Sequence, residues 1–389
     1  MLYNLLQSMD QWLDSVGLHS LLQVLYQREF RAFTAVVVAF FLVLLFGKPW
    51  IRLLIKWKIG DHANFDHAEI DALMKSKENT PTMGGVLLIG SVLVTTFLFA
   101  DLFNHYVRLL MMVIILFAIL GGIDDYLKLV AGHRKPGSRD GLYRWEKLLF
   151  QFGIGVVVAL MAWKYAAVSD AAHSLTLPFV RTYLPGTEAL IVSPHVIILG
   201  VGTFIALSIF MVMLMSNAVN ITDGLDGLAP GTVMIASFAM MVLCYIAGSA
   251  ELAGYLLLPH IEGAAEMMVV AGATAGACLG FLWFNCHPAQ VFMGDTGSMP
   301  LGGLLATIAI IIRQEFLLLI IGGIFIIEIG SSFLQIYYSK FTGGKRIFRC
   351  APIHHHFHRK GWSESQVVTR FWVIAVILAM IALVTIKIR

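Results

Sequence analysis

Residues 195–248 read HVIILGVGTFIALSIFMVMLMSNAVNITDGLDGLAPGTVMIASFAMMVLCYIAG: an apolar run, a short polar segment and a second apolar run. About 20 apolar residues cross a bilayer as a helix, so two membrane-spanning helices are expected here. The polar segment carries Asp223 and Asp226 with no Lys or Arg beside them. Burying an ionised carboxylate is costly unless a cation or hydrogen-bond donors receive it. Other parts of the chain must therefore supply positive charge at this segment.

The whole chain repeats this pattern. Of its 389 residues, 58% are hydrophobic and only 13% are charged, and the apolar residues form about ten continuous runs. The runs lie near 25–46, 82–100, 107–123, 148–166, 195–216, 230–248, 264–284, 298–312, 316–338 and 371–387. Continuous rather than alternating runs exclude a β-barrel. We predict an all-α polytopic membrane protein in which residues 1–389 form one domain and residues 1–20 form an interfacial helix.

The distribution of charge predicts the orientation in the membrane. Most of the 27 Lys and Arg residues follow the odd-numbered runs, which places those connections in the cytoplasm and both termini outside. The net charge of +3 is small, and we expect no nucleic-acid partner. The four cysteines form no CxxC pair, so free thiols are expected.

Four polar segments fall on the predicted cytoplasmic side: residues 121–128, 217–229, 285–298 and 352–358. Acids at membrane depth are usually functional, so we expect these segments to converge on one site. Five acids with no zinc-type set of Cys and His ligands favour a hard cation such as Mg²⁺. The acids are Asp124, Asp125, Asp223, Asp226 and Asp295.

Each acid also has a structural interpretation. On a helix, Asp124 and Asp125 project about 100° apart. In the structural interpretation the two acids only mark the end of an apolar run, and Asp124 forms an i,i+4 ion pair with Lys128. Asp223 and Asp226 lie among glycines that favour a turn, and a plain interhelical turn is the alternative. Asp295 precedes a run, where an N-terminal cap is the alternative.

Four histidines, at 354, 355, 356 and 358, lie in the most basic connection. Consecutive histidines diverge on a helix, which makes a single zinc site awkward, and a basic surface patch is the alternative. Histidine and lysine beside a Mg²⁺ site suit phosphoryl transfer, where the protein neutralises charge and positions groups. Taken together, the segments predict transfer of a phosphorylated group from a soluble nucleotide-linked donor to a lipid.

The chain resembles the polyprenyl-phosphate N-acetylhexosamine-phosphate transferases, from about residue 20 to the C-terminus. Long motifs in the family's order carry the resemblance: TPTMGG (80–85), GIDDYLK (122–128), SNAVNITDGLDGLA (216–229), PAQVFMGDTGS (288–298) and APIHHH (351–356). The three histidines after Ala-Pro-Ile resemble the branch that uses a muramoyl-pentapeptide donor. His358 departs from the pattern, which has an acid there.

The resemblance implies Mg²⁺-dependent transfer of phospho-N-acetylmuramoyl-pentapeptide from its UDP conjugate to undecaprenyl phosphate, giving lipid I and UMP. It also implies a bacterial cytoplasmic (inner) membrane location and a homodimer. Asp295 is then the principal metal ligand, with Asp125 and Asp124 near the metal, and Asp124 either accepts a proton from the lipid phosphate or orients it. The other catalytic positions by similarity are Lys128, Asp223 and His354. The substrate-binding positions are Lys77, Lys147, Asn220, Gly224, Leu225, Asp226, Asn285, Phe292, His355 and His356.

Two other functions fit parts of the sequence. A related transferase that uses UDP-GlcNAc has the same fold, and the histidine motif speaks against it. An ion-coupled transporter also places acids and broken helices in a membrane, but its site lies near the midplane of repeated halves, and no internal repeat is visible here. An intramembrane aspartyl protease needs two facing acids inside the bilayer, and the surroundings of Asp295 do not resemble its motif.

Overall fold

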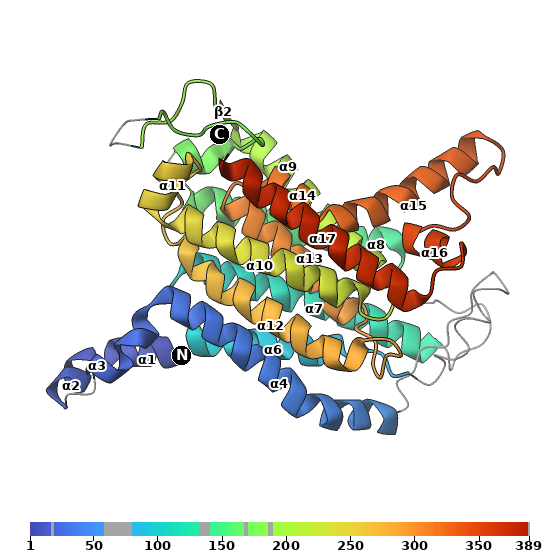
Figure 1. Ribbon diagram of the computed structural model, residues 1–389, viewed down its shortest axis with the longest axis horizontal. Coiled ribbons are helices and arrows are strands. Elements are labelled where there is room, and N and C mark those ends of the chain that lie inside the picture. Colours follow the sequence, from blue (N-terminus) through green and yellow to red (C-terminus); the bar gives the residue numbers. More distant parts are fainter. Residues whose placement is uncertain (17–18, 58–79, 132–140, 167–169, 186–189, 388–389) are drawn as a thin grey trace.

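The computed structural model describes residues 1–16, 19–57, 80–131, 141–166, 170–185 and 190–387, and nearly all their regular structure is helical (Figure 1). The helices of the first half are α1 (Leu2–Ser8), α2 (Asp10–Ser15), α3 (His19–Leu22), η1 (Gln23–Tyr26), α4 (Arg28–Lys56), α6 (Gly85–Phe99), α7 (His105–Ala131), α8 (Arg144–Tyr165) and η3 (Asp170–His173). Those of the second half are α9 (Val201–Thr222), α10 (Leu228–Gly248), α11 (Ala250–Leu256), η4 (Ala264–Glu266), α12 (Met267–Asn285), α13 (Asp295–Ile311), α14 (Glu315–Ile321), α15 (Gly323–Phe341), α16 (Ile353–His358) and α17 (Glu364–Lys387). Two short strands, β1 (Ser174–Leu175) and β2 (Ile197–Ile198), pair antiparallel, with Ser174 opposite Ile198.

The fold confirms a polytopic α-helical membrane protein. Among the described residues, seven helices are long and apolar enough to cross a membrane, namely α4, α7, α8, α9, α10, α12 together with η4, and α17. The helices α6 and α13 are apolar but shorter, and α14 with α15 makes an eighth crossing if the bent pair is one span. Every apolar run of the sequence thus coincides with a helix or a helix pair. Ten crossings and the orientation stay predictions.

Two predicted helices are broken. The run at 316–338 was expected as one helix, but α14 and α15 meet at Gly322 at an angle of 82°. The first part of α15 packs against the body, where its buried residues lie, while its later part projects away from it (Figure 1). A break at a glycine lets the early part pack while the later part diverges. Residues 1–20 likewise begin as the short helices α1 and α2 rather than as one helix.

The centre of the bundle consists of α12 and α13. Every residue of α13 is buried, and so are nearly all those of α12. Small residues allow the close approach: a Cβ on Gly276 would lie 2.0 Å from the carbonyl oxygen of Val36 in α4, and one on Gly303 would lie 2.5 Å from the Phe117 ring in α7. Close backbone contact through small residues is how helices associate where no water drives them together.

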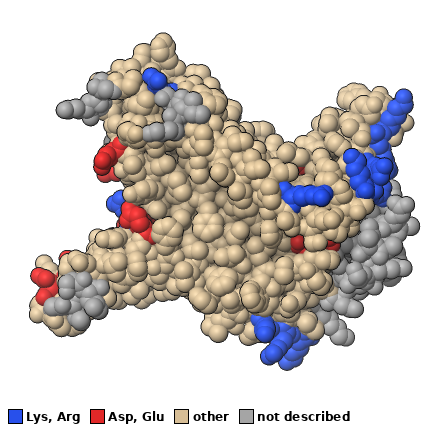
Figure 2. Space-filling view, viewed as in Figure 1, with Lys and Arg blue, Asp and Glu red and all other residues tan. Residues whose placement is uncertain are grey.

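The two ends of the bundle differ in charge. Figure 2 shows Lys and Arg side chains grouped where α4 ends and around α15 and α16, while most of the visible acidic side chains lie toward the opposite end. Both termini lie at that opposite end (Figure 1). This arrangement agrees with the predicted cytoplasmic loops.

Candidate active site

The predicted polar segments converge at the end of the bundle where α7 and α9 finish and α13 begins. Asp124 and Asp125 in the last turns of α7 meet Asp295 at the start of α13, and one oxygen from each lies within 4.8 Å of the others. All three side chains are buried. The approach depends on Gly121, where a Cβ would lie only 2.2 Å from the carbonyl oxygen of Asp295. Acids 170 residues apart in sequence therefore form one cluster.

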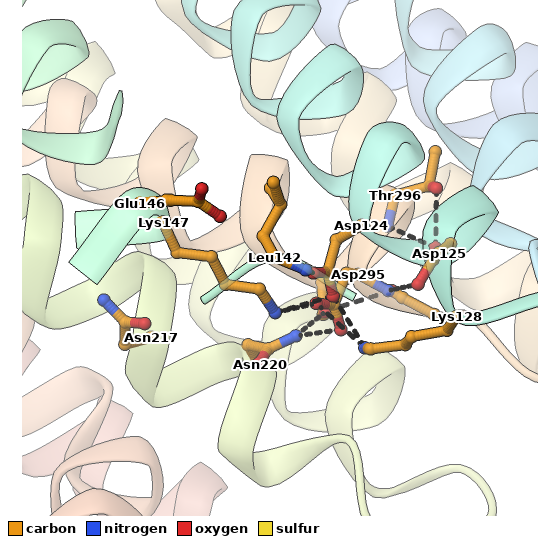
Figure 3. Close-up of polar contacts among 12 residues, drawn as sticks. Asp124, Asp125, Lys128, Leu142, Glu146, Lys147, Asn217, Asn220, Asp295 and Thr296 are labelled. Carbon is orange, nitrogen blue, oxygen red and sulfur yellow. Dashed lines mark hydrogen bonds and ion pairs between the residues drawn. The ribbon is translucent and has the colours of Figure 1, made fainter. Parts of the chain in front are cut away.

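Two lysines supply the positive charge that this cluster requires (Figure 3). Lys128 Nζ lies 2.8 Å from Asp124 Oδ2 and 3.2 Å from Asp295 Oδ2. Lys147 Nζ, from the first turns of α8, lies 2.6 Å and 2.7 Å from the same two oxygens. The i,i+4 pair between Lys128 and Asp124 is thus present, but it is part of a larger network in which each ammonium group bridges two carboxylates.

Asp125 has different partners from its neighbour. Its Oδ1 accepts a hydrogen bond from Asp295 N at 3.1 Å, and its Oδ2 accepts from Thr296 N at 2.9 Å and Thr296 Oγ1 at 2.7 Å. Asp125 therefore caps the N-terminus of α13 from another helix, in the position where a carboxylate is stabilised by the helix dipole. Asp295 lies inside the first turn and is not the cap, because Gly294 precedes it in that place.

The neighbouring helix α9 completes the surroundings of Asp295. Asn220 donates from Nδ2 to Asp295 Oδ1 at 2.7 Å and to Ser298 Oγ at 2.9 Å (Figure 3). One turn earlier, Asn217 donates to Gln151 Oε1 of α8 at 2.6 Å. These bonds fix α8 and α9 beside the carboxylate cluster.

The segment after Asn220 is a turn, as its glycines predicted. The helix α9 ends at Thr222, and Gly227, with φ of 82°, precedes α10. Side chains from other helices hold this turn: Asn285 Oδ1 accepts from Gly227 N at 2.9 Å, and Glu364 Oε1 accepts from Asp226 N at 2.8 Å. Because α9 stops at residue 222, Asn220, Asp223 and Asp226 do not form the single helical face that their spacing allowed.

The two acids of the turn have separate environments. Asp226 Oδ2 accepts from Ala289 N at 3.1 Å and lies 3.0 Å from His287 Nδ1. Asp223 is half-buried, and its pKa is raised well above the ordinary value by desolvation and by the nearby carboxylates of Asp295 and Asp125. The turn therefore adds to the charged centre a carboxyl group whose ionisation is disfavoured.

The histidines of α16 diverge. His354 is buried, and its Nδ1 lies 2.9 Å from Glu328 Oε2. Its Nε2 faces Gly224, where a Cβ would approach to 2.5 Å. His356 Nδ1 accepts from Arg349 N at 3.0 Å, and burial together with Lys360 and Arg349 lowers its pKa. Within the described residues the three histidines do not gather into one metal site, as helical geometry predicted.

Several predicted substrate positions make contacts within the protein. Asn285 is buried, and both ends of its side-chain amide bond to backbone groups: Oδ1 accepts from Gly227 N, and Nδ2 donates to Val291 O at 2.8 Å. Leu225 packs with Val367 and Phe371 of α17. Phe292 is half-buried, and its backbone N donates to Pro81 O at 2.8 Å. His355 is half-buried, and its ring packs edge-on against that of His354. Lys77, with its neighbour Lys75, lies outside the described residues.

Sequence reasoning missed four side chains that hold this site: Thr296, His287, Glu328 and Glu364. Glu328 carried a usable signal, because it is a lone acid within an apolar run. Glu364 lies next to the last run and has no such signal, since its partners are far away in sequence.

The carboxylate cluster fits a hard divalent cation. It offers only oxygen donors, which Mg²⁺ prefers, and the two ammonium groups between Asp124 and Asp295 show that it attracts positive charge. The oxygens of Asp295 and Asp124 face these ammonium groups, whereas both oxygens of Asp125 already accept hydrogen bonds from α13. A divalent metal with the lysines beside it is suited to binding and activating a diphosphate.

Comparisons with known proteins agree with this chemistry. The model of glycosyl transferase family 4 matches residues 107–313, and signature 1 of the phospho-N-acetylmuramoyl-pentapeptide-transferases matches residues 77–89. The chain is 44% identical over 361 residues to the phospho-N-acetylmuramoyl-pentapeptide-transferase of Desulforapulum autotrophicum, covering 92% of this chain and 94% of the relative. It is 41% identical over 360 residues to that of Desulfotalea psychrophila, covering 92% and 93%, and 40% identical over 389 residues to that of Thermodesulfovibrio yellowstonii, covering both chains fully.

The fold and the site define a multi-pass membrane enzyme, a phosphoglycosyl transferase with a lysine-bridged carboxylate centre at one end of its bundle. The chain belongs to glycosyl transferase family 4 and, within it, to the phospho-N-acetylmuramoyl-pentapeptide-transferases of peptidoglycan synthesis.

Proposed function

We propose that the chain transfers phospho-N-acetylmuramoyl-pentapeptide from its UDP conjugate to undecaprenyl phosphate, giving lipid I and UMP with Mg²⁺ as the metal. The name of its relatives states the transferred group. The observation that carries the proposal is the pair of ammonium groups that bridge Asp124 and Asp295. Fixed cations beside a carboxylate cluster are what transfer of a phosphorylated sugar requires.

In this reaction an oxygen of the lipid phosphate forms a bond to the sugar-bearing phosphorus of the donor. The bond from that phosphorus to the bridging oxygen of the diphosphate breaks, and UMP leaves with that oxygen. The net bond change is the same for direct attack and for a route through a covalent enzyme intermediate. Bound Mg²⁺ would neutralise charge on the diphosphate, with Asp295 as its principal ligand and Asp125 or Asp124 beside it.

The protein residues then have defined tasks. Lys128 and Lys147 meet the diphosphate oxygens, because their ammonium groups already lie at the centre of the cluster. Asp124 holds both ammonium groups in place and orients the lipid phosphate near them. Asn220 fixes the side chain of Asp295. The charged groups that bind the diphosphate and the lipid phosphate are thus held in position before a substrate arrives.

The nucleoside is assigned to the surface beside the turn 223–227. Gly224 has no side chain to block a ligand, and the half-buried Phe292 is assigned to the uracil, because an aromatic ring can stack on a base. Leu225, Asn285 and Asp226 support the turn from behind. His354, His355 and His356 are assigned to the muramoyl-pentapeptide end, and Lys77 to the diphosphate.

The test is release of UMP by the purified protein in detergent with undecaprenyl phosphate and Mg²⁺. UDP-MurNAc-pentapeptide and UDP-GlcNAc are offered in parallel, with EDTA and lipid-free controls. We expect lipid-dependent UMP from the muramoyl donor alone, and its loss with EDTA. UMP from UDP-GlcNAc alone would assign the chain to another pathway, and no UMP from either donor would contradict the transferase function and favour a transporter.

Two further properties follow from the same proposal. We place the enzyme in the bacterial cytoplasmic membrane with the site toward the cytoplasm, because UDP-linked donors are made there and the basic loops lie at that end. We also propose that it works as a homodimer, as the family resemblance implies. Light scattering of the protein in detergent, corrected for bound detergent, distinguishes a mass of twice 42.9 kDa from that of the monomer.

A further inference from the structure

The turn 223–227 is tied to the last helix of the chain by a buried carboxylate. Glu364, the first residue of α17, is buried, and its Oε1 accepts a hydrogen bond from Asp226 N at 2.8 Å. Its other oxygen, Oε2, lies 3.4 Å from His287 Nδ1. One side chain therefore connects α17 both to the turn and to the connection between α12 and α13.

Asp226 closes the same network from the other side. Its Oδ2 lies 3.0 Å from His287 Nδ1 and accepts from Ala289 N at 3.1 Å. The backbone of Asp226 is thus held by Glu364, and its side chain is held by the segment 287–289. The imidazole of His287 is placed between two carboxylates, while 44% of its side chain remains exposed.

A second bond from α17 acts on the same turn. Trp372 donates from Nε1 to Gly227 O at 3.2 Å. Its indole lies over Gly231, where a Cβ would approach Nε1 to 2.1 Å. A carboxylate on the amide of one residue and an indole on the carbonyl of the next hold the turn at two consecutive positions.

These bonds matter because the turn contains two glycines. A glycine-containing segment loses much conformational entropy when a ligand fixes it, and ordering it beforehand lowers that cost. We propose that Glu364, together with His287, is a positioning residue that preorganises the turn 223–227 for the uridine part of the donor. This inference rests on the proposed function and adds residues from α17 and from the α12–α13 connection to it.

The proposal separates the two substrates. Glu364 and His287 contact the turn and the α12–α13 connection, whereas Lys128 and Lys147 contact Asp124 and Asp295. Variants of Glu364 and His287 therefore leave in place the groups that serve the lipid phosphate and the chemical step. We expect Glu364→Ala to weaken binding of UMP and to raise KM for the UDP donor, each by about tenfold, the size of effect expected when one buried hydrogen bond to a charged group is lost. The KM for undecaprenyl phosphate and the kcat should change by less than about twofold.

The test is calorimetric titration of the protein in detergent with UMP, followed by steady-state kinetics with each substrate varied. Glu364→Gln keeps an acceptor for Asp226 N, so it should recover most of the UMP affinity that Glu364→Ala loses. His287→Phe keeps a ring at an exposed position but removes the bridge between the two carboxylates, and it should weaken UMP binding although every residue of α17 is unchanged. Glu251→Gln, in the first turn of α11 at the other end of the bundle, is the matched control.

Unchanged UMP affinity in both Glu364→Ala and His287→Phe would overturn the proposal. So would equal increases in KM for donor and lipid accompanied by a lower melting temperature, because a general loss of structure does not distinguish the substrates. A wild-type protein that neither binds UMP nor releases it from any donor would instead contradict the proposed function.

Discussion

At the scale of single residues, neighbours in sequence have different tasks because they leave the helix in different directions. Asp124 faces two ammonium groups, whereas Asp125 faces the N-terminus of α13. The same divergence separates His354, which pairs with Glu328, from His356, which meets the backbone of Arg349. A motif of adjacent identical residues is therefore not a set of equivalent ligands.

Asp295→Asn should abolish turnover while the protein stays folded. Asparagine keeps the shape and the bond from Asn220 but removes the charge that both lysines and the metal need. We expect kcat to fall by at least about 100-fold, as for loss of a preorganised electrostatic group. Asp170→Asn, an exposed acid near the opposite end, is the control. Near-normal UMP release across a Mg²⁺ titration would remove Asp295 from the site.

Asp223 should make the metal-free protein less stable as pH rises. Its pKa in the folded protein is raised above the value of 3.8 by desolvation and neighbouring carboxylates, so folding favours the neutral carboxyl group. The favourable contribution is complete below 3.8 and is lost as pH rises through the raised folded pKa. The side chain in Asp223→Asn cannot ionise. In EDTA, the melting temperature of this variant should therefore rise relative to that of the wild type as pH increases. A pH-independent difference would refute this prediction.

At the scale of elements, the site exists because helices cross at glycines. The start of α6 lies against the start of α13, where Gly84 N and Gly85 N donate to the carbonyl oxygens of Phe292 and Met293, each at 2.8 Å. A Cβ on Gly85 would lie 2.3 Å from the backbone nitrogen of Gly297. The segment that carries Asp295 is therefore positioned by backbone contact, which no larger residue permits.

Gly85→Ala should destabilise the protein, because the added methyl group meets backbone rather than a flexible side chain. We expect a loss of about 1–3 kcal/mol, the usual cost of overpacking, and a lower kcat because Asp295 moves. Gly90→Ala, in the middle of the same helix with nothing within 4 Å of an added Cβ, is a matched control and should be neutral or stabilising. Thermal unfolding in detergent compares the two, and equal melting temperatures would contradict the crossing argument.

At the scale of the whole molecule, the two ends of the bundle hold different ionic groups. The end away from the site contains the buried ion pairs of Arg31 with Glu266 and of Arg313 with Glu315. Glu266 Oε1 also accepts from Asp101 N at 2.7 Å, and Arg313 Nε donates to Ser174 O at 2.9 Å. Ionic groups there tie loops to helices, as Glu364 and His287 also do at the site end, whereas Asp124, Asp295 and the two lysines form a shared cluster.

Cysteine labelling tests the orientation of these two ends. Cys286 is exposed beside the site, and Tyr255 is 70% exposed on α11 near the other end. We expect a membrane-impermeable maleimide to label the wild type only in inverted vesicles. In a Tyr255→Cys variant with Cys286→Ser, it should label intact spheroplasts. Labelling of both positions from the same side would contradict the proposed topology.

What the sequence by itself determined is local: which runs form apolar helices, where the polar segments lie between them, and that Gly224 and Gly227 make a turn. Run length and glycine content depend only on residues close together in the chain, so they can be read from the sequence alone. It also predicted that Asp124, Asp125 and Asp295 lie together, because charges placed at one membrane face must meet their counter-charges. Only the tertiary structure decided that Asp125 caps α13, that α14 and α15 diverge, and that Glu364 holds Asp226. Those choices join residues far apart in the chain, and packing geometry rather than residue type selects among the partners.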